Sequence, residues 1–383
     1  MKKILSDLIE IKGGKRMPKG VMLESTPTNH PYITVKNMAP YKTELDGTFE
    51  YVPNDVFPTI KNYVVKSGDI ILSIVGTIGR VSVVGETLDK ASLTENCAKL
   101  IPNNLILPLY LFYFLTSPFG QTEIIKGVVG STQPKLPFYN IGRIEIDLPT
   151  LTLQQHIVGA IGSVDDLIEK NEEIIDKTNK IISHYFETIP VSSASTKLKD
   201  MFRITIGRTP PTKEHQWFLN GGFGSVPWLS IKDMDSNTTF LTKTSQYLTK
   251  EAVDRFNIPL VEEGDVLLSF KLTVGRVEIS SIEMVTNEAI ACFKSDTNLR
   301  NYLYCYLKKC NFLSDGDNTS SIGQAVNSTI IKNFPFSVPT NISLAEFNEK
   351  TMSLFKLVEE KQKENILLQH DKQALLTRYF GSH

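Results

Sequence analysis

The sequence predicts a mixed α/β (α+β) protein in which two duplicated globular domains alternate with two long helices. Three observations predict it: an internal repeat with a period near 195 residues, two long stretches with heptad spacing, and β-type alternation within each repeat. The 383 residues suffice for two or three domains, each with its own core. We expect a globular domain at 1–150, a long helix at 151–190, a second globular domain at 191–340 and a second long helix at 341–383.

The repeat is clearest in residues 68–81, GDIILSIVGTIGRV, which recur as GDVLLSFKLTVGRV in residues 264–277 with eight of the 14 positions identical. Upstream, YITVKNM at 32–38 matches WLSIKDM at 228–234 at the same offset of 196. DLIEIKGGKRMP likewise matches DMFRITIGRTP, and IEIDLPTLTLQQ matches FPFSVPTNISLAE before each long helix. Four blocks in the same order indicate an internal duplication.

Both halves combine predicted strands with shorter helices. YITVKN and the repeated GD block alternate apolar and polar residues and are rich in β-branched side chains, which predicts strands. The Gly-Thr-Ile-Gly segment within the first block predicts a turn with Arg80 at its exit. Residues 105–128 and 298–314 predict helices packed on the sheet, and each precedes a polar loop, at 130–136 and 320–329.

The stretch 151–188 predicts the first long helix. From Ile157 to Tyr185, residues recur at alternating spacings of four and three, which is a heptad seam, and Leu167, Ile174 and Ile181 widen the apolar stripe beside it. A helix over 157–186 would be roughly 45 Å long at about 1.5 Å per residue. Because one apolar stripe of that length needs covering, we expect a partner helix.

The stretch 344–380 repeats this spacing with a poorer seam that contains Lys361 and Lys372. Each stretch also carries a seam Asn, which would fix the register of a helix pair, and each ends on Tyr-Phe. We therefore expect the two helices to pair, the alternative being two ordinary amphipathic helices on separate domains. The predicted seam residues are Ile157, Ile161, Val164, Ile168, Asn171, Ile175, Ile182, Tyr185, Phe347, Leu354, Val358, Asn365, Leu368, Leu375 and Tyr379.

The charge balance excludes a strongly basic domain. The globular segments are near neutral, with 16 Lys and Arg against 14 Asp and Glu in residues 1–150, and 16 against 15 in residues 191–340. The first helical stretch, 151–190, is acidic, with 3 against 7. Since nucleic-acid-binding domains are usually basic, any DNA affinity would require clustered cations on one face or help from partners.

The sequence contains no motif of a stand-alone enzyme. It lacks a GxxxxGK[ST] phosphate loop, paired or HExxH histidines, and an Asn/Asp-Pro-Pro-Tyr/Phe run of the kind that holds an amino group for methyl transfer. Cys97 and Cys292 lie in apolar strand-like runs without CxxC spacing, so we expect buried thiols. No apolar run approaches the ~20 residues that span a bilayer, and the amino terminus lacks a complete signal sequence, so we expect a cytoplasmic protein. We predict no catalytic residue and no metal site.

The order of these parts resembles the specificity subunits of type I restriction–modification systems. The resemblance covers essentially the whole chain and rests on GD-[IV]-[IL]-L-S…GR-V in each half and on LP-x-L-x-x-Q-x-x-I at the start of the first helix. The latter motif comprises Leu148, Pro149, Leu151, Gln154, Gln155 and Ile157. The second helix departs from the pattern, with Leu344, Ala345 and Glu346 where a Gln-rich opening is expected.

The resemblance implies that each globular segment is a target recognition domain that reads one half of a bipartite double-stranded DNA target. It also implies that the helices pack antiparallel with pseudo-two-fold symmetry, set the spacer and dock two methyltransferase (modification) subunits. Such a complex methylates adenine N6 with S-adenosylmethionine, and motor-nuclease (restriction) subunits add cleavage that needs ATP and Mg. These cofactors belong to the partner subunits, so the resemblance implies none in this chain. A rod of roughly 45 Å would separate the two readers by about 13 base pairs.

By the same resemblance, loops at one edge of each globular segment contact DNA. Arg and Lys can bind guanine or phosphate, whereas Asn and Gln can pair with adenine. The candidates in the first half are Lys15, Arg16, Lys36, Asn37, Thr77, Arg80, Ser131, Thr132, Gln133 and Lys135. Those in the second half are Arg208, Thr209, Ser230, Lys232, Lys271, Thr273, Arg276, Gln324 and Asn327. Because Arg80 and Arg276 follow the same turn in both halves, they could instead be structural or bind phosphate.

Three alternatives stay open at this point. The near-neutral charge also suits a coiled-coil scaffold that tethers two non-DNA ligands. A specificity chain of a fused restriction–methylation enzyme would differ only in its partner. A stand-alone enzyme would require turnover of a methyl donor or of ATP by the purified chain.

Overall fold

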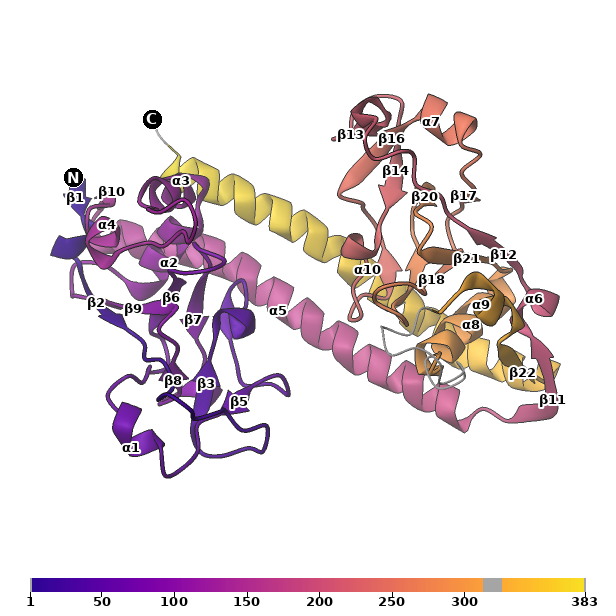
Figure 1. Ribbon diagram of the computed structural model, residues 1–383, viewed down its shortest axis with the longest axis horizontal. Helices are drawn as coiled ribbons and strands as arrows, with labels where there is room; N and C mark the ends of the chain where they lie inside the picture. The colour runs from indigo at the N-terminus through magenta and orange to yellow at the C-terminus, as the bar shows by residue number, and fades with distance from the viewer. Residues whose placement is uncertain (1, 313–325, 382–383) are drawn as a thin grey trace. The chain divides into compact units, whose positions relative to one another are not determined.

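The computed structural model describes residues 2–312 and 326–381. The chain divides into two compact units (Figure 1): unit 1 comprises Met1–Glu169 with Leu367–His383, and unit 2 comprises Lys170–Ile366. Each unit contains one globular half together with segments of both long helices, α5 (Leu151–Thr188) and α10 (Asn341–Phe380).

Unit 1 is built on a five-stranded sheet beside a three-stranded one. The larger sheet has the order β2 (Ile9–Gly13), β9 (Cys97–Pro102), β6 (Ile70–Ser73), β7 (Val81–Val84) and β4 (Lys42–Thr43). The smaller has the order β5 (Glu50–Tyr51), β3 (Pro31–Ile33) and β8 (Ser92–Leu93), and a two-stranded sheet pairs β1 (Lys2–Ile4) with β10 (Glu145–Asp147). The helices are α1 (Phe57–Ile60), α2 (Pro108–Thr116), α3 (Pro118–Lys126) and α4 (Phe138–Gly142), with short 3-10 turns η1 (Leu5–Asp7), η2 (Val35–Asn37) and η3 (Glu86–Leu88).

Unit 2 repeats the larger sheet strand for strand. Its order is β12 (Arg203–Ile206), β21 (Ile290–Lys294), β18 (Val266–Ser269), β19 (Val277–Ser280) and β15 (Phe240–Leu241). A second sheet has the order β13 (Phe218–Leu219), β16 (Gln246–Thr249), β14 (Ser225–Leu229), β20 (Met284–Thr286) and β17 (Leu260–Val261), and β11 (Val191–Lys197) pairs with β22 (Pro335–Pro339). The helices are α6 (Leu198–Met201), α7 (Lys250–Arg255), α8 (Thr297–Lys309) and α9 (Ser328–Asn333), with 3-10 turns η4 (His215–Trp217) and η5 (Ile231–Asp233). The predicted duplication is therefore confirmed in the topology.

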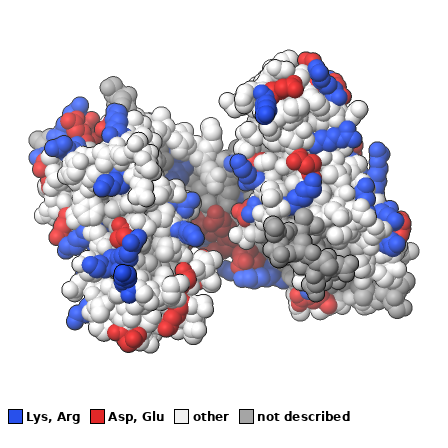
Figure 2. Space-filling model, in the orientation of Figure 1, with Lys and Arg blue, Asp and Glu red and all other residues white. Residues whose placement is uncertain are grey.

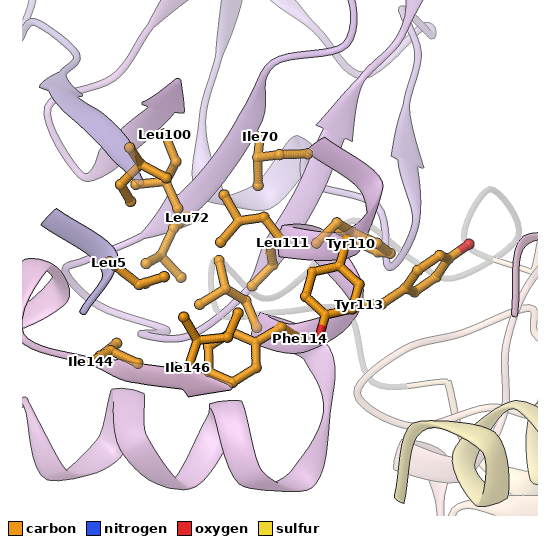
Figure 3. Packing of buried hydrophobic residues seen from close by; sticks show 14 of the residues in the cluster. Leu5, Ile70, Leu72, Leu100, Tyr110, Leu111, Tyr113, Phe114, Ile144 and Ile146 are labelled. Carbon is orange, nitrogen blue, oxygen red and sulfur yellow. The ribbon is translucent and has the colours of Figure 1, made fainter. Parts of the chain in front are cut away.

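The core of unit 1 lies between the larger sheet, α2 and the long helices. Ile70 and Leu72 of β6 face Leu111 of α2, and Figure 3 shows these side chains interlocking. Six consecutive residues of α2, from Tyr110 to Leu115, are buried, which explains why this helix is apolar around its whole circumference. The Tyr110 hydroxyl donates to the Asp147 carbonyl at 3.2 Å, and Tyr302 of α8 donates in the same way to Ser337 at 3.0 Å.

The predicted helix pair is confirmed, and the two helices run antiparallel. In unit 1 the start of α5 packs against the end of α10, with Ile161 and Phe380 in one core. In unit 2 the end of α5 packs against the start of α10, with Ile182 and Phe347 in one core. The aromatic packing is alike at both ends, because Phe380 lies 5.2 Å from Tyr110 and Phe186 lies 5.2 Å from Tyr302, centroid to centroid.

Polar contacts cross between the helices in both units. In unit 2 the Asn171 amide donates to the Asn365 carbonyl oxygen at 2.9 Å, and both residues are buried. In unit 1 the Lys372 ammonium lies 2.5 Å from the Asp165 carboxylate, whose side chain is 4% exposed. Tyr113 also donates to Asp165 at 2.9 Å, and the Lys372 nitrogen lies 5.5 Å from the Tyr41 ring. Desolvation, and then the adjacent Asp165, raise the pKa of Tyr113.

The predicted seam residues are all buried or half-buried, whereas the flanking Leu167, Ile174 and Ile181 are 48%, 36% and 46% exposed. The opening of each long helix is anchored alike. Gln154 of α5 is fully buried and its amide donates to the Leu105 carbonyl, and Asn348 of α10 donates to Asn298 at 2.9 Å. Asn348 thus ties α10 to α8 from a position one helical turn further along than that of Gln154.

Candidate nucleic-acid interface

The turn between β6 and β7 and the turn between β18 and β19 have the same construction. In the first, the Ser73 hydroxyl donates to the Thr77 carbonyl at 2.6 Å and accepts from the Arg80 N–H at 2.8 Å. In the second, Ser269 makes the matching bonds to Thr273 and Arg276 at 2.6 and 3.0 Å. The serine of each GD block thus closes a seven-residue turn, which accounts for its presence in both repeats.

The two turn arginines anchor the backbone. Arg80 donates through Nη1 to the Val35 carbonyl at 3.3 Å. Arg276 donates through Nη1 to the carbonyls of Ile231 and Met234 at 3.0 and 2.6 Å. Each arginine therefore ties its turn to η2 or η5, which supports the structural role left open for them. The prediction of a strand throughout YITVKN is wrong for Val35–Asn37, which form η2 because Thr34 and Asn37 close a capping box there.

Backbone hydrogen bonds gather four loops of unit 1 at one edge of the sheets. The Lys15 N–H donates to Leu93 at 2.8 Å, and the Thr94 N–H donates to Ile33 at 3.1 Å. The Ile74 N–H donates to Asn96 at 2.8 Å, and the Leu136 N–H donates to the Ile74 carbonyl at 2.9 Å. The loop after β2, η2, the β6–β7 turn and the loop 129–136 are thereby held around the segment 93–97. We call this the loop edge of unit 1.

Unit 2 has a loop edge built by corresponding bonds. The Arg208 N–H donates to Thr286 at 2.8 Å, the Asn287 N–H to Leu229 at 2.9 Å and the Phe270 N–H to Ala289 at 3.0 Å. The loop after β12, η5 and the β18–β19 turn are thus held around the segment 286–290. The duplicated chain produces the same edge twice.

The first-half candidates lie on the loop edge of unit 1, but several have side chains already engaged. Arg16 forms an ion pair with Glu95 at 2.8 Å. Asn37 completes a capping box with Thr34, accepting its N–H at 2.9 Å. Arg80 is exposed, but it is engaged by the Val35 carbonyl as described above. The remaining first-half candidates are exposed side chains: Lys15, Lys36, Thr77, Ser131, Thr132, Gln133 and Lys135.

In unit 2, Lys271, Thr273 and Arg276 lie on the β18–β19 turn, and Lys232 is exposed on η5. Ser230 forms a capping box with Asp233, and Arg208 donates to the Phe256 carbonyl at 2.9 Å. Asn327 lies at the start of α9, where its side chain accepts the Ile330 N–H at 3.0 Å. Gln324 lies outside the described residues.

Sequence reasoning missed one acidic residue at each loop edge. Glu95 follows Thr94 in the central segment of unit 1, and Glu288 follows Asn287 at the corresponding place in unit 2. Glu95 accepts from Arg16, and Glu288 accepts from the Thr209 hydroxyl. A Glu after Thr94 and after Asn287 is a weak sequence signal for a loop-edge residue. The two positions correspond only once the backbone bonds from Thr94 to Ile33 and from Asn287 to Leu229 are known.

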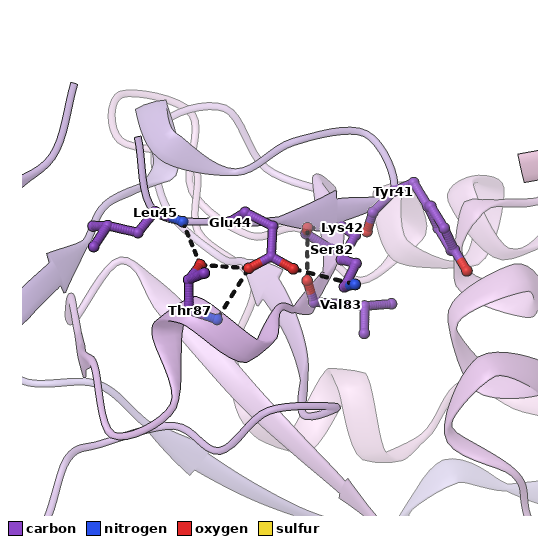
Figure 4. A network of polar contacts seen from close by, with 7 residues as sticks. All are labelled: Tyr41, Lys42, Glu44, Leu45, Ser82, Val83 and Thr87. Atoms are coloured by element: carbon purple, nitrogen blue, oxygen red, sulfur yellow. Dashed lines mark hydrogen bonds and ion pairs between the residues drawn. The ribbon is translucent and has the colours of Figure 1, made fainter. Parts of the chain in front are cut away.

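A polar network fixes the strand β4 against β7 and η3 in unit 1 (Figure 4). The Glu44 carboxylate accepts the Thr87 N–H at 3.1 Å and pairs with Lys42 at 3.2 Å. Burial opposes ionisation of Glu44, but the bonds from Thr87 and Lys42 outweigh it and lower the pKa of the carboxyl. The Ser82 hydroxyl donates to the Tyr41 carbonyl at 3.1 Å, which joins β7 to the start of β4.

Charged side chains of both signs are interspersed over the globular halves, and the face in Figure 2 shows no continuous basic stripe. Within residues 2–312 and 326–381, no group of three His, Cys, Asp or Glu side chains could hold a metal ion. Cys97 and Cys292 are buried, and burial raises the pKa of the Cys97 thiol to about 12. No helix in the described part of the chain is long and apolar enough to cross a membrane.

Known proteins share this sequence pattern and this fold. The type I restriction enzyme MjaIX specificity subunit of Methanocaldococcus jannaschii is 22% identical over 413 aligned residues, which cover 98% of this chain and 91% of the relative. The type I restriction enzyme HindI specificity subunit of Haemophilus influenzae is 21% identical, covering 82% of this chain and 86% of the relative. The crystal structure of the type I restriction–modification S subunit from M. genitalium aligns over 100% of this chain and 96% of its own, with a TM-score of 0.55 and 13% identity.

The family assignment rests on a match over both halves. Residues 1–180 and residues 190–369 each match the sequence profile described as the type I restriction modification DNA specificity domain. The two matches together cover most of the chain and coincide with the two sequence repeats. The chain therefore belongs to the type I restriction modification DNA specificity domain family and carries two copies of that domain.

Proposed function

We propose that this chain is the DNA sequence-specificity subunit of a type I restriction–modification enzyme. The observation that carries the proposal is the presence of two DNA specificity domains in one chain, each with a loop edge of the same construction. Two matching edges suit a bipartite DNA target, because each can contact one half-site. Two DNA specificity domains weigh against a scaffold for non-DNA ligands.

Each domain would read its half-site through its loop edge. Lys15, Lys36 and Lys135 in unit 1, and Lys232 and Lys271 in unit 2, are exposed cations that can bind phosphate or guanine. Gln133 can pair with adenine. Arg80 and Arg276 would act mainly by holding the turns, because each already donates to backbone carbonyls.

The helix pair would set the spacing between half-sites and dock methyltransferase subunits. Leu167, Ile174 and Ile181 support a docking role, because they recur every seven residues on α5 and remain exposed. Exposed apolar side chains in such a row favour contact with another protein. The relatives are named as specificity subunits of type I restriction enzymes, so we infer methyltransferase and motor-nuclease partners.

The chemistry would belong to those partners. We propose that S-adenosylmethionine, ATP and Mg bind the partner subunits and that this chain itself contributes no catalytic residue. A protein that acts on DNA in such a complex would work in the cytoplasm.

A selection from a random duplex library tests the proposal. The full chain, alone and with candidate methyltransferase subunits, is incubated with the library at two salt concentrations, and bound duplexes are sequenced. We expect one bipartite sequence with a fixed gap, and binding that strengthens as salt falls. Recovery of duplexes with no common sequence at either salt concentration would contradict the proposal.

A further inference from the structure

The two repeated turns share a left-handed backbone at one position but carry different residues there. Gly76 in unit 1 has φ of 77°, and Leu272 stands at the corresponding place in unit 2 with φ of 60°. Both values lie in the left-handed region, which glycine adopts readily and a bulky L-residue does not. The same turn is thus built once with its usual residue and once with leucine.

Leu272 gains no burial in return for this conformation. A left-handed backbone is strained for a non-glycine residue. The side chain of Leu272 is 97% exposed, so contacts within the chain do not offset that strain. A Cβ added at Gly76 would meet no atom within 4 Å, so the turn itself leaves open space at this position.

The other described non-glycine residues with positive φ have local reasons for it. Asn257 belongs to a residue type that tolerates this region, and the Lys90 N–H donates to the Val65 carbonyl at 2.9 Å. At Leu272 the Thr273 N–H donates to the Lys271 carbonyl at 2.7 Å, which closes the backbone around this residue, on the turn that Ser269 and Arg276 hold in place. Lys271 and Thr273 are both exposed. A fixed turn therefore presents an apolar side chain among polar DNA-contact candidates.

We propose that Leu272 is a specificity residue that makes an apolar contact with the base pairs of the half-site read by unit 2. The inference rests on the proposed function. An apolar side chain can pack on the methyl group of thymine in the major groove, or against a base face at an opened step. Unit 1 has no such contact at its own turn, because Gly76 has no side chain.

Two substitutions separate the contact from the fold. Leu272→Asn keeps the approximate size and suits the left-handed backbone, and Leu272→Gly removes the side chain and the strain. Both variants should retain the wild-type melting temperature or exceed it. Either variant removes the apolar surface that the DNA would bury on Leu272, so binding to the selected target should weaken roughly tenfold. Binding to a duplex with a scrambled second half-site should not change.

Two controls define the kind of contact. Lys271→Ala should weaken binding to both duplexes and reduce the salt dependence, because a phosphate contact is independent of sequence. Ile125→Ala removes another exposed apolar side chain, on α3 of unit 1, and should leave binding unchanged. Wild-type binding to both duplexes at two salt concentrations provides the reference.

Measurement of Kd for the full chain on these duplexes decides the question. Replacing the thymines of the second half-site by uracil should weaken wild-type binding and leave the Leu272→Asn variant unaffected if the contact is to a methyl group. If Leu272→Asn weakens binding equally to the thymine duplex and to the uracil duplex, the leucine packs on a base face and not on a methyl group. If the wild type discriminates the target and both Leu272 variants discriminate it equally well, the inference is wrong. If the wild type itself does not discriminate, the proposed function fails instead.

Discussion

The buried ion pair between α5 and α10 in unit 1 permits a quantitative prediction. Replacing Lys372 with Met keeps the length of the side chain but leaves Asp165 buried, with the Tyr113 hydroxyl still donating to its carboxylate. Removing one partner of a buried pair typically costs 3–5 kcal/mol, because the other charge stays desolvated. Loss of the contact with the Tyr41 ring would add about 0.5–2 kcal/mol. We therefore expect Lys372→Met to lower the free energy of unfolding of unit 1 by roughly 3.5–7 kcal/mol.

Separate probes can follow the two units in a urea titration. Cys97 is fully buried in unit 1, so its reaction with a thiol reagent reports the opening of that unit. The two tryptophans, Trp217 and Trp228, both lie in unit 2, and their fluorescence reports unit 2. The variant should shift the Cys97 transition to lower urea by the predicted free energy. The double variant Asp165→Asn/Lys372→Met should recover part of the loss, since it removes the unpaired charge.

An exposed pair on α10 supplies the control. Lys356 lies 3.8 Å from Glu360, and the side chains are 75% and 61% exposed. This pair lies in unit 2, so Lys356→Met is followed by tryptophan fluorescence and should cost no more than about 0.5 kcal/mol. If Lys372→Met changed the Cys97 transition by less than about 1 kcal/mol, the buried pair would contribute no more than a surface pair, and the reasoning would be refuted.

Three further predictions follow from single features of the units. Glu278 is 1% exposed and burial raises its pKa to about 8, so the folded state holds it protonated while the unfolded state ionises near pH 4.5. The stability of unit 2 should therefore fall as pH rises from about 4.5 to about 8, by about 5 kcal/mol in total, and Glu278→Gln should flatten this dependence in Trp-monitored urea titrations. A Cβ on Gly14 would lie 2.1 Å from the Thr94 carbonyl oxygen and one on Gly207 would lie 2.1 Å from that of Thr286, whereas one on Gly47 meets nothing within 4 Å. Gly14→Ala and Gly207→Ala should each cost about 1–3 kcal/mol or more in the unit concerned, and Gly47→Ala should cost little; equal effects of all three in thermal melts would contradict this account. Exchanging residues 1–150 for those of a relative with another target should change only one half of the selected sequence, and a change in both halves would show that the domains do not read independently.

The long-range organisation of the chain was predictable because the duplicated blocks can be recognised in the sequence itself. The four repeated blocks predict two domains of one topology, and the heptad spacing predicts both long helices and their pairing. The Asn171–Asn365 contact follows from the same pattern, since a polar residue at the seam of each helix is stable when buried only if it meets a hydrogen-bonding partner.

The site was less predictable, because its geometry depends on contacts between distant segments. Lys372 weakens the predicted seam, yet it is satisfied by Asp165 and by the aromatic ring of Tyr41 from another part of unit 1. The sequence pattern predicts Arg80 as a free loop cation, but its guanidinium donates to the carbonyl of Val35, which lies 45 residues earlier in the chain. Neither the left-handed backbone of Leu272 nor the engagement of Arg16 by Glu95 leaves a local sequence signal.

The most direct test of the proposed specificity role is a map of N6-methyladenine across the genome of a host that expresses this chain with a methyltransferase subunit. A host with the methyltransferase subunit alone provides the background. We expect methylation at one split motif with a fixed gap, present only when this chain is expressed. A stable complex of the two proteins that leaves the genome unmethylated, or methylation at the same sites without this chain, would contradict the account.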